Sequence, residues 1–174
     1  EANAAHVIVL PSDVDCHASV ALAAHAVRSE GITVHMIGTT NVLASLSALA
    51  VFDPAGELFQ SLNTMTQAAQ GTRDGAVFVA VRSSMTAAGL CQVGDVIGVI
   101  ERVPNEVSSI ASIDDMVVHV VDAMLDRGGE LVTVLVGKHG NEAIGDRLAA
   151  DHPGIEFSII RGDQTSHPYL VGVE

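Results

Sequence analysis

The stretch that decides the fold is RGDQTSHPYLVGVE, residues 161–174, in which a polar loop meets a proline and then an apolar run. A chain terminus usually frays into polar residues. Residues 169–173 are instead apolar and β-favouring, which predicts a terminal strand inserted into a sheet. The loop before this strand carries the densest set of hydrogen-bonding side chains in the C-terminal half. We expect Gln164 and His167 to hold that loop in shape and to line a cleft.

Three more polar clusters follow or interrupt predicted strands elsewhere in the chain. They are Ser12 and Asp13, then Thr39, Thr40 and Asn41, and finally Arg82, Ser83 and Ser84. The first two clusters follow strands of one βαβ unit, and open α/β sheets place ligands at the carboxyl ends of such strands. These side chains, with Gln164 and His167, are therefore the ligand or cleft candidates.

Strands alternate with helices in the N-terminal part of the chain. Apolar runs at residues 6–10 and 32–37 predict two strands, and Ala- and Leu-rich runs at 18–28 and 42–51 predict a helix after each. This βαβα order is typical of a parallel sheet with right-handed crossovers.

The rest of the chain continues this rhythm with one interruption. Residues 90–107 hold short β pieces separated by glycines and a proline, which predicts an antiparallel excursion. The other expected elements are helices at 57–72, 113–125 and 141–150 and strands at 75–81, 131–136 and 155–160. The predicted fold class is α/β, with two linked α/β lobes, largely parallel sheets and the short antiparallel excursion. The expected lobes cover residues 1–84 and 113–174, joined by a β-rich connection at 85–112.

Charge and composition exclude several classes of function. The 174 residues contain 8 Lys and Arg against 21 Asp and Glu, a formal charge of −13, which argues against binding nucleic acid or an anionic membrane surface. No apolar run approaches the roughly 18 residues of a membrane span, so we expect no membrane insertion. Cys16 and Cys91 fit no metal or redox spacing, which favours a reducing cytoplasm. Because the chain begins at Glu1 without an initiator methionine, we expect a piece of a longer polypeptide.

Each candidate side chain also has a structural interpretation. Ser12 and Asp13 can hold a ligand carboxylate or cap the following helix, and capping is the default role of such residues. The hydroxyls and amide at 39–41 have the same two interpretations. Arg82 beside two serines suits a carboxylate or a phosphate, and an ion pair with one of the many acids is its alternative. For His167, a loop-structuring role is favoured over catalysis.

The sequence assembles no complete catalytic or metal-binding set. Its 8 histidines show no HxxxH or HExxH spacing. Residues 137–140, GKHG, lack the upstream glycine and the following hydroxyl of a phosphate-cradling loop. No nucleophile, base and oxyanion hole come together. We therefore expect no catalytic residue, metal or cofactor in this chain.

Five segments occur in the order and spacing of one known family. They are LPSD at 10–13, TTNVLASLSALAVFDP at 39–54, GDVIGVI at 94–100, ELVTVLVGKHG at 130–140 and GDQTSHPYLVGVE at 162–174. The chain resembles the C-terminal domain of fatty acid kinase FakA, among the dihydroxyacetone-kinase-related, Dak-phosphatase-like proteins. That domain is similar in fold to DegV-type fatty-acid-binding proteins. The resemblance implies that ATP and Mg²⁺ bind an N-terminal kinase domain outside this chain.

Three functions are compatible with these observations. The first, implied by the resemblance, is a non-catalytic C-terminal module of a bacterial fatty-acid-kinase-like protein that docks a DegV-type fatty-acid-binding partner, whose acyl carboxylate the kinase domain phosphorylates. The second is a DegV-like pocket for a fatty acid or another small carboxylate, with Thr39, Arg82, Ser83, Ser84 and His167 around the head group. The third is a stand-alone phosphatase-like enzyme, which only the family label suggests.

Overall fold

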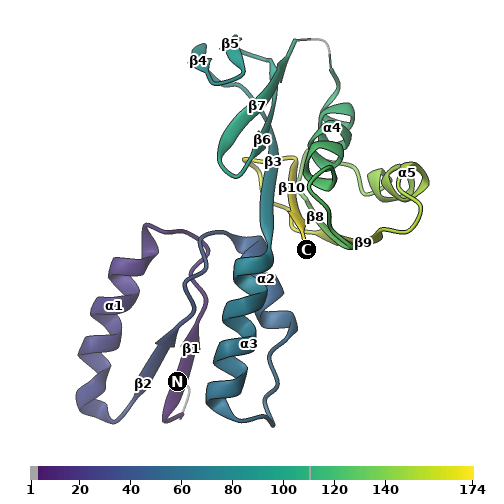
Figure 1. Cartoon of the computed structure of the whole chain (residues 1–174). Helices are drawn as coiled ribbons and strands as arrows, with labels where there is room; N and C mark the ends of the chain where they lie inside the picture. The colour runs from purple at the N-terminus through teal and green to yellow at the C-terminus, as the bar shows by residue number, and fades with distance from the viewer. Residues whose placement is uncertain (1–3, 110) are drawn as a thin grey trace. The chain divides into compact units, whose positions relative to one another are not determined.

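The structure, a computed structural model, describes residues 4–109 and 111–174 (Figure 1). The chain forms two compact units, Glu1–Thr72 and Arg73–Glu174. Each unit contains its own sheet and its own cluster of buried apolar side chains.

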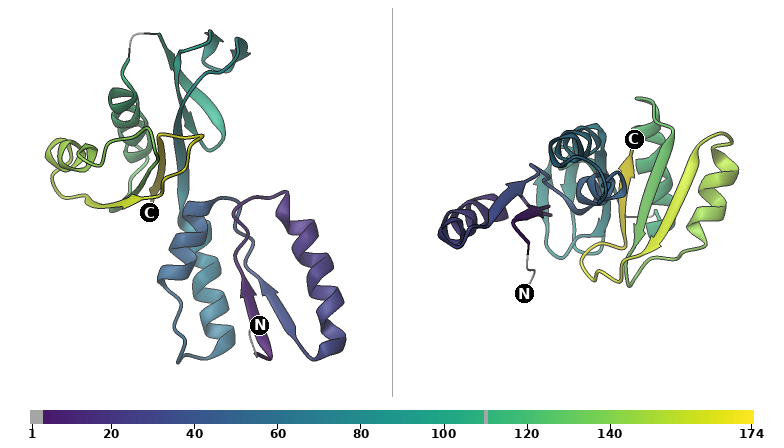
Figure 2. Two further views of the ribbon diagram at one scale, coloured as in Figure 1. Left: turned by 180° about the vertical axis from the view of Figure 1, so that it is seen from behind. Right: turned by 90° about the horizontal axis from the view of Figure 1, so that it is seen from below.

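A two-stranded parallel sheet lies at the centre of the first unit. Strand β1 (His6–Val9) pairs with β2 (Thr33–Met36), and helix α1 (Cys16–Val27) with the short 3-10 helix η1 (Arg28–Glu30) connects them. Helices α2 (Val42–Ala50) and α3 (Leu58–Gly71) follow β2. In Figure 1, α1 lies beside β2, whereas α2 and α3 lie beside β1, and the view from behind in Figure 2 shows the same order. The parallel pair predicted here is confirmed.

Single residues set the helix boundaries of the first unit. Gly31 ends η1 with φ 78°, a left-handed conformation that favours glycine. Asn41 begins α2, because its Oδ1 accepts a hydrogen bond from the backbone N–H of Ala44 at 2.8 Å. The buried members of the core between helices and sheet are Ile37, Ala48 and Met65. This small core is packed by partly buried neighbours from both strands and helices.

The second unit is built on a six-stranded sheet in the order β7-β6-β3-β10-β8-β9. Its strands are β3 (Arg73–Val79), β6 (Val96–Ile100), β7 (Val103–Ser108), β8 (Leu131–Val136), β9 (Glu156–Arg161) and β10 (Tyr169–Val173). Within this described sheet, β8 and β9 pair in parallel and the four other neighbouring pairs are antiparallel. The expectation of largely parallel sheets is therefore wrong for this unit. The terminal strand β10 runs antiparallel to both β3 and β8, which sets the direction of the sheet.

Short connections explain the antiparallel pairing on the other side of β3. Strands β6 and β7 are joined by Glu101 and Arg102, whose φ values of 48° and 67° form a tight turn that matches the twist of a hairpin. A two-residue connection allows only antiparallel neighbours, because parallel strands need a long crossover. Between β3 and β6, strands β4 (Ser84–Thr86) and β5 (Gly89–Cys91) form a separate hairpin. The predicted antiparallel excursion is therefore confirmed.

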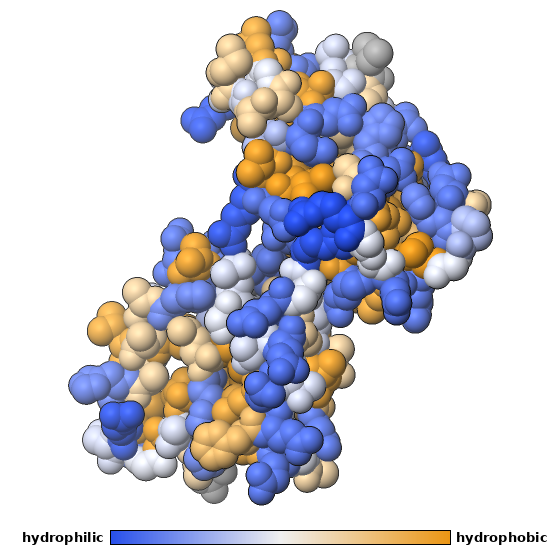
Figure 3. All heavy atoms as spheres, in the orientation of Figure 1, coloured by the Kyte–Doolittle hydropathy of each residue, from blue (hydrophilic) through white to orange (hydrophobic). Residues whose placement is uncertain are grey.

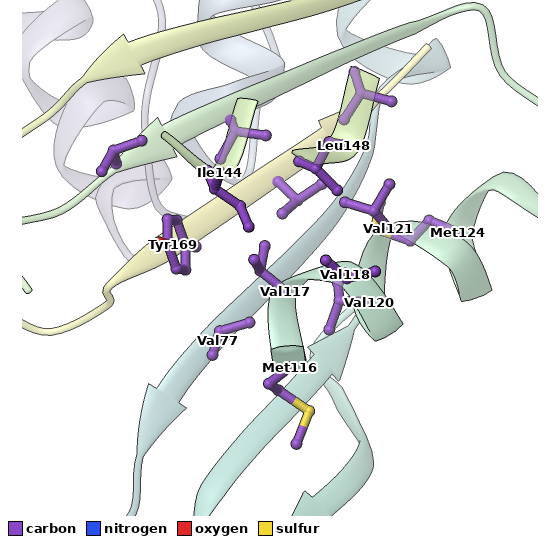
Figure 4. Close-up of a cluster of buried hydrophobic side chains, with 14 of the residues drawn as sticks. Val77, Met116, Val117, Val118, Val120, Val121, Met124, Ile144, Leu148 and Tyr169 are labelled. Carbon is purple, nitrogen blue, oxygen red and sulfur yellow. The ribbon is translucent and has the colours of Figure 1, made fainter. Parts of the chain in front are cut away.

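Helices α4 (Ile113–Leu125) and α5 (Ile144–Asp151) bury their apolar sides against this sheet. Ser112 begins α4, because its Oγ accepts a hydrogen bond from the N–H of Asp115 at 3.0 Å. Figure 4 shows side chains of both helices meeting Val77 of β3 and Tyr169 of β10 in one cluster. Two strand glycines make room for α4. A Cβ at Gly75 or Gly98 would lie 2.8 or 2.9 Å from the methyl groups of Val120.

Candidate functional site

The carboxyl ends of β1 and β2 bring the N-terminal candidates to one edge. Thr39 is buried, and its hydroxyl donates a hydrogen bond to the backbone carbonyl of Pro11. Ser45 donates to the same carbonyl at 3.1 Å. His17 Nε2 lies 2.7 Å from the carbonyl oxygen of Thr39, so this ring nitrogen carries the donated proton. The loops after the two strands are thus held together through backbone groups.

The other candidates at this edge serve loops and helix ends or face solvent. Asn41 caps α2, and Asp13 Oδ1 accepts a hydrogen bond from the N–H of Asp15 at 3.0 Å. Ser12 is exposed, whereas Thr40 is half-buried. The geometry corresponds to the capping interpretation of these residues rather than to a set of side chains aimed at a common ligand.

The end of β3 carries the second group of candidates. Arg82, Ser83 and Ser84 are all exposed. Arg82 and Ser84 line a cavity of about 210 Å³, whose apolar wall includes Phe78 and Ile97. An arginine and a hydroxyl beside an apolar wall can orient a small anion or a partner's carboxylate.

The terminal loop reaches the same end of β3. Because β10 pairs antiparallel with β3, with Tyr169 opposite Val77, the residues before β10 lie beside the residues after β3. The ring of His167 packs edge-on against Phe78, with centroids 5.8 Å apart. Burial lowers the pKa of His167, so the neutral ring is favoured. The structure thus brings His167 into the neighbourhood of Arg82 and Ser84 through Phe78.

Gln164 fixes the shape of the terminal loop. Its Nε2 donates to the carbonyl oxygen of Leu135 at 3.1 Å, and its own backbone carbonyl accepts a hydrogen bond from the N–H of Lys138 at 2.9 Å. Gly137 lies directly under the loop, since a Cβ there would clash with the carbonyl oxygen of His167. Residues 137–140, GKHG, therefore form the seat of the terminal loop.

Arg82 and Lys138 have a feature in common that the sequence did not reveal. Within the described residues, neither forms an ion pair within 4.0 Å. The nearby Arg161 is instead paired with Asp163 and Glu142. The ion-pair alternative for Arg82 is therefore not realised with an acid of the described chain, and its guanidinium is available to a group from outside.

The first unit contains the largest of the cavities described, about 420 Å³. Its apolar lining comprises Ile8, Leu10, Leu49, Phe52, Leu58 and Met65. Its polar or charged side chains are those of His6, Asp53 and Ser61. The sequence did not single out these residues, because their apolar members have the spacing of ordinary core positions on a strand and two helices.

Residues 4–109 and 111–174 provide neither a metal site nor a membrane-spanning helix. No group of three or more His, Cys, Asp or Glu in these residues could hold a metal ion. No described helix combines the length and apolar character needed to cross a bilayer.

This fold is that of an α/β protein of the DegV-like class. It is similar to the Fatty Acid Kinase (Fak) B3 protein of Streptococcus pneumoniae, solved loaded with linoleic acid, with a TM-score of 0.68 and 12% identity over 99% of this chain and 73% of that chain. DegV family protein Cg2579 from Corynebacterium glutamicum gives 0.64 and 14% over 97% and 75%. The dihydroxyacetone kinase of C. freundii gives 0.63 and 17% over 97% and 38%. At such identities the likeness concerns the fold alone.

The amino-acid sequence defines the family more narrowly. Residues 1–174 match the C-terminal domain family of fatty acid kinase FakA-like proteins, and the chain belongs to it. It is 28% identical over 174 residues to an uncharacterized protein of Staphylococcus haemolyticus and 24% identical over 171 residues to one of Staphylococcus aureus. Both matches cover 96% of this chain, which spans only 30% of the length of either relative. The resemblance noted in the sequence is confirmed.

Proposed function

We propose that this chain is a non-catalytic docking module. In this proposal it is the C-terminal part of a bacterial fatty-acid-kinase-like protein and holds a DegV-type fatty-acid-binding protein. A kinase domain elsewhere in the polypeptide then phosphorylates the acyl carboxylate that the partner carries. The observation that carries the proposal is the family match over residues 1–174. The greater length of the relatives leaves room for such a kinase domain.

The hydrogen bonds of the candidate residues support a non-catalytic role. Thr39, Asn41 and Gln164 bond to backbone groups, so they hold loops rather than activate a nucleophile. ATP and Mg²⁺ bind the kinase domain in this scheme, and the present chain contributes by positioning the partner's carboxylate for the reaction. The proposal places the complex in the cytoplasm, in keeping with the free thiols of Cys16 and Cys91.

A pull-down tests this proposal. The tagged 174-residue chain is incubated with the fatty-acid-loaded DegV-type protein encoded in the same genome, and the full-length kinase serves as the positive control. We expect the chain alone to retain the partner. Retention by the full-length kinase but not by the chain would place docking in another domain and contradict the proposal.

The cavity of the first unit favours a second candidate function, the binding of an apolar ligand. A mostly apolar cavity of a few hundred Å³ is typical of small-molecule sites, and this one measures about 420 Å³. Its polar side chains differ from those expected around a head group, because Thr39, Arg82 and His167 do not line it. Asp53 at its wall opposes a carboxylate, so this cavity suits an apolar ligand with a neutral or cationic head group.

Mass spectrometry of gently extracted protein tests the second candidate. A ligand that co-purifies with the wild-type chain, and is lost from Leu49→Asp at the exposed wall of the cavity, would support it. Because Leu49 is exposed, this change leaves the core intact. Recovery of no ligand, or of the same ligand from both proteins, would contradict it.

A further inference from the structure

The β4–β5 hairpin presents an apolar surface to solvent. Val81, Met85, Leu90 and Val93 are 88%, 75%, 61% and 67% exposed. Figure 3 shows hydrophobic atoms gathered over β4 and β5. A contiguous group of exposed apolar side chains on a folded domain marks an interaction site more often than chance exposure does.

The pairing of the hairpin explains why these side chains point outward. Met85 and Leu90 are directly opposite each other across β4 and β5, so they lie on the same face. Cys91, the next residue after Leu90, points to the other face and is buried with Ala80 and Ile97. The inner face of the hairpin therefore anchors it to the unit, while the outer face remains without a described partner.

Charge distinguishes the hairpin from the rest of the chain. Residues 79–94 contain one charged side chain, Arg82, and no acid, although the whole chain carries −13. Arg82 forms no ion pair with the described residues and lines the cavity of about 210 Å³ at the base of the hairpin. The surface thus combines two projecting apolar side chains, an apolar recess and one available cation.

We propose that the β4–β5 hairpin is the surface that docks the DegV-type partner. Met85 and Leu90 pack into an apolar area of the partner, and Arg82 pairs with a carboxylate at the edge of that area. The inference rests on the docking function proposed above and adds where docking occurs. A second copy of this chain fits less well, because hairpin-to-hairpin contact would place two Arg82 side chains together without an acid between them.

Binding measurements with matched variants test the surface. The dissociation constant of the chain for the fatty-acid-loaded DegV-type protein is measured by calorimetry for wild type, Met85→Glu, Leu90→Glu and Arg82→Glu. Controls are Phe59→Glu on α3, where the side chain is also 75% exposed, and Arg28→Glu, which is an exposed arginine of the first unit. Truncating central interface residues commonly weakens binding by about tenfold or more. We expect that loss for the hairpin variants and a change within about twofold for the controls.

The possible outcomes separate the two proposals. Wild-type affinity in all three hairpin variants would overturn the hairpin as the docking surface and leave the docking function standing. Absence of binding by the wild-type chain would overturn the docking function and this inference with it. A photo-crosslinker at Val81 in the otherwise wild-type chain gives a second readout that needs no destabilising change. A partner adduct is expected, whereas an adduct with a second copy of the chain alone would overturn the proposal.

Discussion

The hydroxyl of Tyr169 donates a hydrogen bond to the carboxylate of Asp114, which joins the first residue of β10 to the first turn of α4. The same hydroxyl accepts a hydrogen bond from the N–H of Asn141 at 2.8 Å. Burial, followed by the bond to Asp114, raises the pKa of Tyr169, so the phenol remains protonated at neutral pH. The terminal strand is therefore fastened at its first residue to two other parts of the unit.

Removing this hydroxyl should destabilise the second unit. Tyr169→Phe keeps the buried ring but leaves Asp114 and the N–H of Asn141 without this partner. A lost buried hydrogen bond of this kind costs about 1–3 kcal/mol. Urea unfolding measures the change, with the exposed Phe59→Leu as a control expected to stay within about 0.5 kcal/mol of wild type. Equal stability of Tyr169→Phe and wild type would show that the connection contributes nothing.

Gly75 should tolerate no side chain, because α4 lies directly over it. A Cβ there would lie 2.7 Å from Met124 Sδ and 2.8 Å from Val120 Cγ1. Overpacking of this kind costs about 1–3 kcal/mol, so Gly75→Ala should lower the free energy of unfolding by that amount. Gly71→Ala at the end of α3 is the control, since nothing lies within 4 Å of its Cβ position. A similar loss in both variants would contradict the close approach of α4.

The burial of His167 predicts a pH dependence of stability. Burial lowers its pKa below the ordinary value of 6.5, so the unfolded chain binds the proton more readily. The contribution of this residue is therefore present above about 6.5 and is lost as the pH falls through the folded pKa. We expect His167→Phe to reduce the decline of the unfolding free energy on acidification, while His139→Gln, at an exposed position, leaves it unchanged. Superimposable pH profiles of His167→Phe and wild type would refute this effect.

The anchoring of the hairpin predicts unequal reactivity of the two thiols. Cys16 is exposed, whereas Cys91 is 2% exposed beneath the hairpin. Ellman's reagent should therefore modify one thiol of the native chain rapidly and the second only on unfolding. In Cys16→Ser, the remaining thiol should react slowly. Rapid reaction of that variant would mean that the inner face of the hairpin is open to solvent.

Local patterns in the sequence predicted the elements well and their partners poorly. Strand β8 begins and ends where its apolar run does, and α4 begins after the capping residue Ser112. The pairing of β10 with β3 joins residues about a hundred positions apart, and alternation along a strand does not say which strand lies beside it. The β6–β7 turn at Glu101 and Arg102 lacks the Asn-Gly or Asp-Gly signal by which hairpins are recognised.

The candidate site shows the same division. Helix capping by Asn41 was predicted as the structural alternative, because its local pattern carries that information. The contact of His167 with Phe78 depends on the long-range pairing of β10 with β3, so no local pattern indicated it. The exposure of Met85 and Leu90 was also hidden, since apolar residues in a short β run usually predict core positions.

A competition assay tests the docking function most directly. Phosphorylation of the fatty acid on the DegV-type partner is followed with the full-length kinase while the isolated 174-residue chain is added in increasing amounts. Docking predicts saturable inhibition by the wild-type chain, because it occupies the partner without phosphorylating its cargo, and much weaker inhibition by Met85→Glu. An unchanged rate with a large excess of the wild-type chain would contradict the docking function.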